Sequence, residues 1–526
     1  MANQEVSRTT GRVPSPRAGR REWIGLAVIA LPCLLYSMDL TVLNLAVPHI
    51  SADLKPSSAQ LLWIVDIYGF LIAGSLITMG TLGDRIGRRR LLLIGAAAFG
   101  AASVLAAFST SAGMLIATRA LLGIAGATLA PSTLSLIRNM FLDPGQRTFA
   151  IGVWATSYSV GAAIGPLLGG ILLEYFWWGS VFLLAVPIMV LLLVVGPVLL
   201  PEFRDPQAGR LDLLSAAQSL AAVLLVIYGL KKLAQDGPGW PPALSILAGL
   251  GTGVLFVQRQ RRLTDPLIDL RLFRVPAFSA SLGGYTLGTL VAFGIYIFIA
   301  QYLQLVLGLS PFQAGLATVP SMGAFIVGSM VVPAIARRVR PAYLMAAGMV
   351  IAAVGFGVLT QVDRTSGLTV LITGSIIYSL GISPVVILAT DLIVGSAPVE
   401  RAGAASAISE TSSELGGALG IAIFGSIGTV VYRRAMWEAV PDSVSPEAME
   451  AARSTLGGAL AVASQLPHGS GAELLGAARE AFTQAFHLTA AISAAVALIT
   501  ALLATVLLRS VRVGNRPAST PAESPS

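Results

Sequence analysis

The sequence contains very little of what disulfide-bonded or metal-binding proteins are built from. It has one cysteine, Cys33, and three histidines among its 526 residues. A single cysteine cannot form an intramolecular disulfide or anchor a zinc cluster. The histidines, His49, His468 and His487, are scattered and support no metal site. We therefore expect neither a thiol enzyme nor a metal enzyme, and no cofactor apart from a transported ion.

Charged residues are also scarce, and their scarcity excludes an ordinary soluble fold. Only 11% of the residues are charged, 55% are hydrophobic, and the mean hydropathy is +0.79. This composition leaves too little polar surface to cover the protein in water. A bilayer core of about 30 Å takes about 20 apolar residues per helix, and runs of that length recur between Trp23 and Leu508. The prediction is an all-α membrane protein solvated by the lipid bilayer.

The basic residues indicate topology rather than nucleic-acid binding. The net charge is +8, but lysine and arginine do not gather on one face with interleaved aromatic residues. With about fourteen spans, 25 of the 34 lysines and arginines fall on the side of the two termini, and eight fall on the other. Cytoplasmic loops carry such an excess. We expect a bacterial inner-membrane protein with both termini in the cytoplasm and no cleaved signal peptide.

A weak internal repeat divides the chain. The basic loop at residues 80–90 has a shorter echo at residues 336–340, as expected for two six-helix bundles around a midplane site. The predicted segments are a cytoplasmic tail (1–21), an N-terminal bundle (22–202), two inserted helices (203–262), a C-terminal bundle (263–508) and a second cytoplasmic tail (509–526). The long outer connection, 433–482, is expected to form a small hairpin, either as a tolerated insertion or with a gating role. We expect a monomer.

Two glycine-rich motifs predict close helix contacts. In the loop at 80–90, glycines permit turning and close approach, while Asp84 can cap a helix start and pair with an arginine. Inside span five, Pro166 kinks the helix and its flanking glycines admit a neighbour, which predicts a bendable seam between the bundles. The motif residues are Gly80, Asp84, Arg85, Gly87 and Arg88 in the loop, and Gly161, Gly165, Pro166, Gly169 and Gly170 in the span.

These motifs resemble those of the major facilitator superfamily. The matching stretches are 80–90 (its hallmark loop), 118–127 (its fourth-helix motif), 161–170 (the fifth-helix motif of its drug exporters), 38–48 (the first-helix signature of its fourteen-helix drug:proton antiporters), 63–68 (its quaternary-ammonium exporters) and 301–315. The resemblance implies a major facilitator fold. It also implies export of dyes, quaternary ammonium compounds and antibiotics in exchange for protons.

Six charged side chains fall inside predicted spans: Asp39, Asp66, Arg119, Asp391, Glu410 and Glu414. Each costs at least ~2.5 kcal/mol at a helix centre, so each should face protein or water. Glu410 and Glu414 share a helix face, and such a pair can hold a proton when empty and lose it when a cation arrives. The alternative is a role as acids at the helix start. The quaternary-ammonium exporters also have acids at these places, but Ser409 replaces a third acid of some relatives, which weighs against a strong preference for divalent cations.

The remaining charged groups receive separate expectations. Arg119 should pair with a carboxylate such as Asp39, or with backbone carbonyls, and help to pass the proton. Asp39 and Asp66 should line an outward vestibule and bind drug, or else act as caps, and Asp391 should be structural. The aromatic residues Trp63, Trp154 and Tyr158 are candidates for a lining that attracts cations. Trp63 is equally consistent with an anchor at the lipid interface.

The predicted function is proton-coupled export of lipophilic, often cationic small-molecule drugs by alternating access. One alternative is dedicated export of a single endogenous antibiotic or metabolite, which suits a chain with 31 arginines and 3 lysines from a GC-rich bacterial genome. A membrane enzyme or sensor would need a nucleophile, metal ligands or a soluble domain, and the sequence offers none. A channel fits the repeat and the intramembrane carboxylates less well than a carrier.

Overall fold

The computed structural model describes residues 16–56, 58–204, 212–237, 239–264, 266–363, 367–437 and 446–509, and in these ranges it contains helices but no strand. Fourteen helical segments are long and apolar enough to cross a membrane. The predicted number of spans is therefore confirmed. Large hydrophobic side chains point outward along them, for example Val194 and Val198 at 67% exposure each. Such apolar surface requires lipid around it.

The N-terminal bundle builds its six spans from eight helices, because spans four and six are each interrupted once. Its helices are α1 (Arg20–Leu54), α2 (Ser58–Ile86), α3 (Arg88–Ala107), α4 (Ala112–Gly126), α5 (Leu129–Met140), α6 (Pro144–Tyr175), α7 (Ser180–Leu183) and α8 (Ala185–Leu199). Span four consists of α4 and α5, and span six of α7 and α8.

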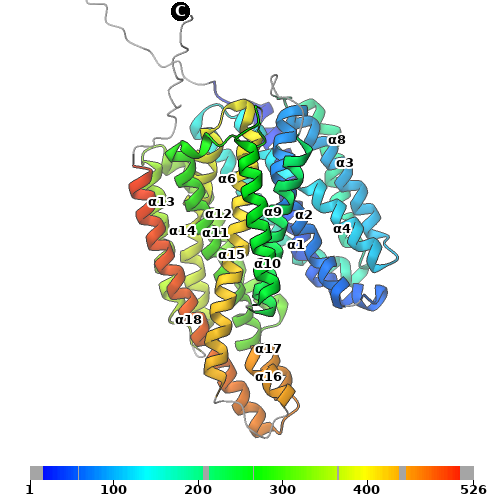
Figure 1. Ribbon diagram of the computed structural model, residues 1–526, viewed down its shortest axis with the longest axis vertical. Coiled ribbons are helices and arrows are strands. Elements are labelled where there is room, and N and C mark those ends of the chain that lie inside the picture. The colour runs from blue at the N-terminus through cyan, green and yellow to red at the C-terminus, as the bar shows by residue number, and fades with distance from the viewer. Residues whose placement is uncertain are drawn as a thin grey trace, which may run out of the picture.

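The two inserted helices, α9 (Leu213–Asp236) and α10 (Trp240–Gln260), pack on each other as a pair. Asp212 caps the start of α9, and its Oδ2 lies 2.7 Å from Nε of Arg259 in α10. Hydrogen bonds from Arg259 hold the pKa of Asp212 well below its usual range. Helix α9 contacts both α2 and α15, so the insertion touches both bundles (Figure 1).

The C-terminal bundle supplies the last six spans. Its elements are η1 (Leu272–Arg274), α11 (Pro276–Gln301), the π-helical η2 (Tyr302–Val306), α12 (Pro311–Ala336), α13 (Pro341–Leu359), α14 (Gly367–Ser396), η3 (Val399–Arg401), α15 (Ala402–Met436), α16 (Pro446–Ser454), α17 (Leu456–Ala463) and α18 (His468–Leu507).

The molecule has two distinct ends. We call the end with Arg20 and Leu507 the terminal end, and the end with α16 and α17 the hairpin end (Figure 1). Helices α15 and α18 contain 35 and 40 residues, which at 1.5 Å per residue exceeds the thickness of a bilayer core. Helices α16 and α17 lie within the predicted connection 433–482, and the flanking helices α15 and α18 extend into it as far as Met436 and from His468.

Candidate functional site

The acidic pair of α15 lies where the two bundles meet. Glu410 and Glu414 come eight and twelve residues after Ala402, the first residue of the helix, so neither is an acid of the helix start. Tyr36 of α1 donates a hydrogen bond to Glu414 Oε1 at 3.0 Å. Glu410 Oε1 is buried and has no hydrogen-bond partner among the described residues. Both side chains are half-buried, so the pair is neither sealed in the core nor fully exposed.

Aromatic rings of the N-terminal bundle surround the hydroxyl that contacts Glu414. The Tyr36 ring centroid lies 5.5 Å from that of Tyr158 and 6.3 Å from that of Tyr68. The hydroxyls of Tyr68 and Tyr158 are buried without a hydrogen-bond partner in the described part of the chain. These two hydroxyls and Glu410 Oε1 are thus three polar atoms near the bundle interface without a hydrogen-bond partner in the described residues. Such an arrangement favours a polar ligand or water there.

The two predicted tryptophans occupy different environments. Trp154 is only 3% exposed, and its Nε1 donates to Thr133 Oγ1 at 3.1 Å. Its ring packs 4.9 Å from that of Tyr158. In this state the polar atom of Trp154 turns into the N-terminal bundle and its ring supports Tyr158, so a place for Trp154 in the substrate lining stays a prediction. Trp63 is 42% exposed and packs 6.1 Å from the Phe70 ring.

Arg119 and Asp39 form a buried ion pair in the N-terminal bundle. Arg119 Nη1 lies 2.6 Å from Asp39 Oδ2, and Arg119 Nε donates to Ile64 O at 3.2 Å. The guanidinium also lies 4.6 Å from the centroid of the Tyr68 ring. Both expected types of partner, a carboxylate and a backbone carbonyl, are therefore present. Because Arg119 is fully buried, these contacts offset the large cost of removing its charge from water.

A second ion pair had not been foreseen. Lys231 Nζ of α9 lies 2.5 Å from Asp66 Oδ1 of α2, and 4.6 Å from the centroid of the Phe70 ring. In the sequence Lys231 ends an apolar run and counts as a loop charge on the outer side. The structure corrects that placement, since the lysine lies inside span seven, Leu213–Leu233, and its side chain reaches α2. Asp66 consequently has a built-in cationic partner.

The charge balance around the bundle interface follows from these pairs. Four carboxylates, at Asp39, Asp66, Glu410 and Glu414, face two cations, Arg119 and Lys231. Each cation is bound to one aspartate, whereas the two glutamates have no cationic partner within 4 Å among the described residues. The glutamate pair is thus the part of the site that can accept a proton or an external cation.

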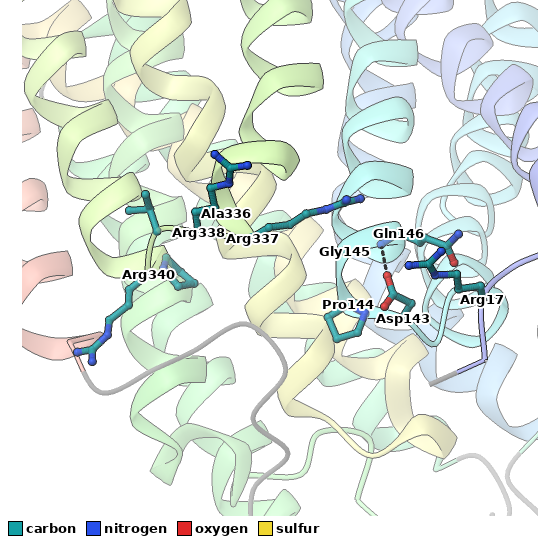
Figure 2. A pocket seen from close by; sticks show the side chains of 11 residues that line it. Arg17, Asp143, Pro144, Gly145, Gln146, Ala336, Arg337, Arg338 and Arg340 are labelled. Carbon is teal, nitrogen blue, oxygen red and sulfur yellow. Dashed lines mark hydrogen bonds between the residues drawn. The ribbon is translucent and has the colours of Figure 1, made fainter. Parts of the chain in front are cut away.

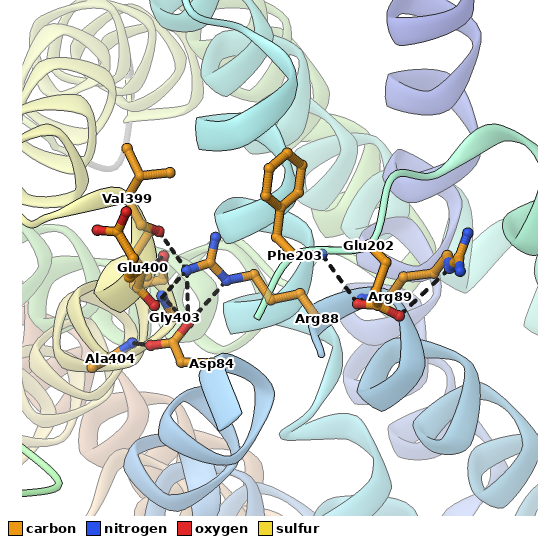
Figure 3. A network of polar contacts seen from close by, with 11 residues as sticks. Asp84, Arg88, Arg89, Glu202, Phe203, Val399, Glu400, Gly403 and Ala404 are labelled. Carbon is orange, nitrogen blue, oxygen red and sulfur yellow. Dashed lines mark hydrogen bonds and ion pairs between the residues drawn. The ribbon is translucent and has the colours of Figure 1, made fainter. Parts of the chain in front are cut away.

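The 80–90 loop of the sequence forms the end of α2, a turn at Gly87 and the start of α3, and it fastens the two bundles together at the terminal end (Figure 3). Asp84 accepts hydrogen bonds from the backbone nitrogens of Gly403 and Ala404 at 2.9 Å each, and thereby caps α15 of the other bundle. Arg88 pairs with Asp84 at 2.8 Å and donates to Val399 O at 2.6 Å. The predicted capping and pairing of Asp84 are confirmed.

The glycines of this loop have separate tasks. A methyl group on Gly80 would overlap Gly403 O and Ala407, so this glycine permits close contact of α2 with α15. Gly87 has a φ of +112°, a conformation that other residues rarely adopt. Arg85 is half-buried at the end of α2. The loop thus combines a sharp turn with a contact across the bundle interface.

A second connection at the terminal end involves Asp391. Arg147 Nε of α6 lies 2.5 Å from Asp391 Oδ1 of α14, and Thr148 Oγ1 donates to Asp391 Oδ2 at 2.8 Å. Asp391 is 3% exposed. A structural role fits this geometry, since the carboxylate is engaged on both oxygens by the other bundle.

Comparison with known proteins places this architecture in a family. The family model of the Major Facilitator Superfamily matches residues 29–421. The chain belongs to the Major Facilitator Superfamily. Over 482 residues it is 44% identical to the multidrug efflux pump LfrA of Mycolicibacterium smegmatis, covering 92% of this chain and 95% of that one. It is 39% identical to the methyl viologen resistance protein SmvA of Salmonella typhimurium, covering 88% and 93%.

Solved structures agree with the superfamily fold. The human organic anion transporter MFSD10 superimposes with a TM-score of 0.59 at 16% identity, covering 92% of this chain and 99% of that chain. At this identity the likeness concerns the fold alone. A superfamily member with fourteen apolar helices is a multi-pass membrane transporter rather than an enzyme.

The glycines at 161–170 of span five form a close helix contact, but in a different place from the one expected. A methyl group on Gly161 would overlap Leu34 O, and one on Gly169 would overlap Val42, both in α1. The seam therefore joins α6 to α1 inside the N-terminal bundle, and the expectation of a seam between bundles was wrong. Gly165 is buried, Gly170 has open space around it, and the side chain of Pro166 lies outside the described residues. Glycine spacing predicts a close contact but does not identify the partner.

A cavity at the terminal end does not include the glutamate pair in its lining. It has a volume of about 760 Å³ and opens at the terminal end between α6 and the α12 to α13 turn (Figure 2). A much smaller space of about 10 Å³ adjoins Asp39 between α1, α3, α7 and the start of α8.

Proposed function

We propose that the protein exports lipophilic cations, and other drug-like molecules, across the inner membrane in exchange for protons. In this proposal the terminal end faces the cytoplasm, because 25 of the 34 lysines and arginines lie on the side of the termini. Two relatives support this choice of cargo, since one is a multidrug efflux pump and the other a methyl viologen resistance protein.

One observation carries the proposal. Glu410 and Glu414 stand one helical turn apart beside the bundle interface, with an unpartnered oxygen on Glu410 and a tyrosine from the opposite bundle on Glu414. Two neighbouring carboxylates without a cationic partner attract both protons and a cation, so protons and an incoming cation compete for the same pair. Cargo and protons therefore exclude one another at this pair, which is the requirement for antiport.

The contacts between the bundles supply the second half of the mechanism. Those made by Asp84, Arg88 and Asp391 lie at the terminal end, so the described state is closed toward the proposed cytoplasm. Protons from outside would reach the glutamate pair and favour release of cargo outward, after which rocking of the bundles would separate these contacts. A charge crossing 100 mV carries ~2.3 kcal/mol, so entry of two protons for one monovalent cation is driven forward.

Drug-induced proton release from the purified protein tests the coupling. We expect a lipophilic monocation to displace protons from the native chain and to displace far fewer from Glu410→Gln or Glu414→Gln. Glu174→Gln is the matched control, because it neutralises an exposed glutamate of α6 distant from the pair. Equal proton release from all four proteins would exclude the glutamate pair as the coupling site.

A transport assay separates this proposal from export of one endogenous metabolite. Ethidium and several other cations are loaded into cells that carry the native chain, and the rate of efflux is measured. A broad exporter removes most of them. Export of a single antibiotic and of none of the cations would support the dedicated exporter.

A further inference from the structure

The cavity at the terminal end is built from both bundles. One wall comes from the start of α6, at residues 143–146, and the other from residues 336–341, which connect α12 to α13 (Figure 2). The N-terminal segment closes a third side with Arg17, and Ala18 N donates to Gln146 Oε1 at 2.8 Å. Rocking of one bundle against the other must therefore divide this cavity.

Its electrostatic character is strongly positive. The charged residues that line it are Arg17, Arg337, Arg338 and Arg340 against the single acid Asp143. Asp143 is already engaged, because its Oδ1 accepts a hydrogen bond from Gln146 N at 2.9 Å. Arg340 donates to Arg509 O at 3.2 Å, whereas the other three arginines make no ion pair with any described residue. Gathering like charges at close range costs free energy unless an anion compensates them.

These arginines differ from the other basic cluster at the same end of the molecule. Between the end of α2 and the start of α3, Arg88 is held by Asp84, and Arg89 lies 3.6 Å from Glu202. That cluster is balanced by the protein itself. At the cavity, Arg337 and Arg17 instead point toward the first turn of α6 (Figure 2), and Gly145 lacks the Cβ that would press on Arg337 Nε at 3.2 Å. Because Gly145 has no side chain, the guanidinium of Arg337 in the C-terminal bundle can lie against the first turn of α6 in the N-terminal bundle.

We propose that this cavity binds a phosphate group, in the first place that of an anionic lipid headgroup, and that the bound phosphate holds the two bundles together at the terminal end. Arginine binds phosphate by paired hydrogen bonds, and basic pockets between helices near a membrane surface suit lipid headgroups. Since the ligand contacts walls from both bundles, it stabilises the state that is closed at this end. The inference does not depend on which cargo the protein carries.

Thiol labelling in lipid nanodiscs tests the proposal. Ser329 of α12 is fully buried, and its carbonyl lies against Gly152 of α6. In a Cys33→Ser background, Ser329→Cys should react with a membrane-impermeant maleimide only when α6 and α12 separate. We expect phosphatidylglycerol, compared with phosphatidylcholine alone, to slow labelling by about fivefold. The slowing should disappear in Arg337→Gln/Arg338→Gln and become smaller in Arg17→Gln.

A matched variant and a second ligand distinguish the alternatives. Arg261→Gln/Arg262→Gln removes the same charge from exposed positions at the same end, outside the cavity, and should retain the slowing. Inorganic phosphate added to phosphatidylcholine nanodiscs separates the sources, because slowing by the free ion would support the site with a soluble ligand. Equal slowing by phosphatidylglycerol in both double variants would overturn the proposal, as would no slowing in the native sequence.

Discussion

Lys231 and Asp66 connect the inserted helices to the N-terminal bundle, with 2.5 Å between Nζ and Oδ1. The lysine is the only described cation other than Arg119 that pairs with one of the four carboxylates near the bundle interface. In the proposed mechanism, a fixed cation at this place neutralises one negative charge and repels a second positive charge on the cargo. The inserted pair of helices thus contributes to the charge of the site, not only to its packing.

Replacement of Lys231 by methionine should shift charge selectivity. Without its partner, Asp66 becomes an additional free carboxylate, so export of the dication methyl viologen should rise relative to the monocation ethidium. We expect a change in the ratio of about three- to tenfold, since partly exposed charges interact by ~1 kcal/mol. Efflux of both compounds is measured in everted vesicles. Lys232→Met removes a neighbouring charge and serves as the control; the same ratio in both variants would contradict a role for the pair.

Arg119→Ala should abolish proton-coupled export and also lower stability. Loss of one partner from a buried ion pair costs about 3–5 kcal/mol, because Asp39 is left without its cation. The double variant Asp39→Asn/Arg119→Met removes both charges and should regain much of that stability without regaining export. Melting temperature and ethidium efflux are measured together. Full export by either variant would remove the pair from the mechanism.

The hydrogen bond between Tyr36 and Glu414 can be tested with a paired tyrosine. Tyr36→Phe removes one contact across the bundle interface, which is worth about 0.5–1.5 kcal/mol, so ethidium export should fall by roughly two- to tenfold. Tyr158→Phe removes a hydroxyl that has no hydrogen-bond partner in the described part of the chain. It should change export by less than Tyr36→Phe. The reverse order would show that the free hydroxyl, rather than the bonded one, handles the cargo.

Two glycines of α6 should respond oppositely to alanine. Gly161 lies against the backbone of α1 at Leu34, so Gly161→Ala must push the helices apart and lower the melting temperature. Gly170 has open space, so Gly170→Ala should leave the melting temperature unchanged or raise it, since alanine favours helix by about 1 kcal/mol. Both substitutions replace glycine by alanine in the same helix, so only the surroundings of the two positions differ. Equal losses from both variants would contradict the seam with α1.

Prediction from the sequence was most successful where a residue's own chemistry limits its choices. A charged side chain inside a span must find a partner, so the presence of Arg119 predicted a carboxylate such as Asp39 or backbone carbonyls beside it. The capping role of Asp84 followed in the same way from an acid and glycines at a turn. Lys231 was missed because it lies at the end of an apolar run, where a lysine can face either water or a neighbouring helix.

The sequence by itself determined the membrane location, the fourteen spans and the intramembrane charges, because burial in lipid depends on hydropathy and length along one segment. Only the tertiary structure decided which bundle each side chain faces. It turned Trp154 into the core, joined α6 to α1 at Gly161, and brought Arg17 beside Arg337 across a cavity. Those outcomes depend on how helices far apart in the chain rotate and pack against each other, and no local pattern of residues fixes that rotation.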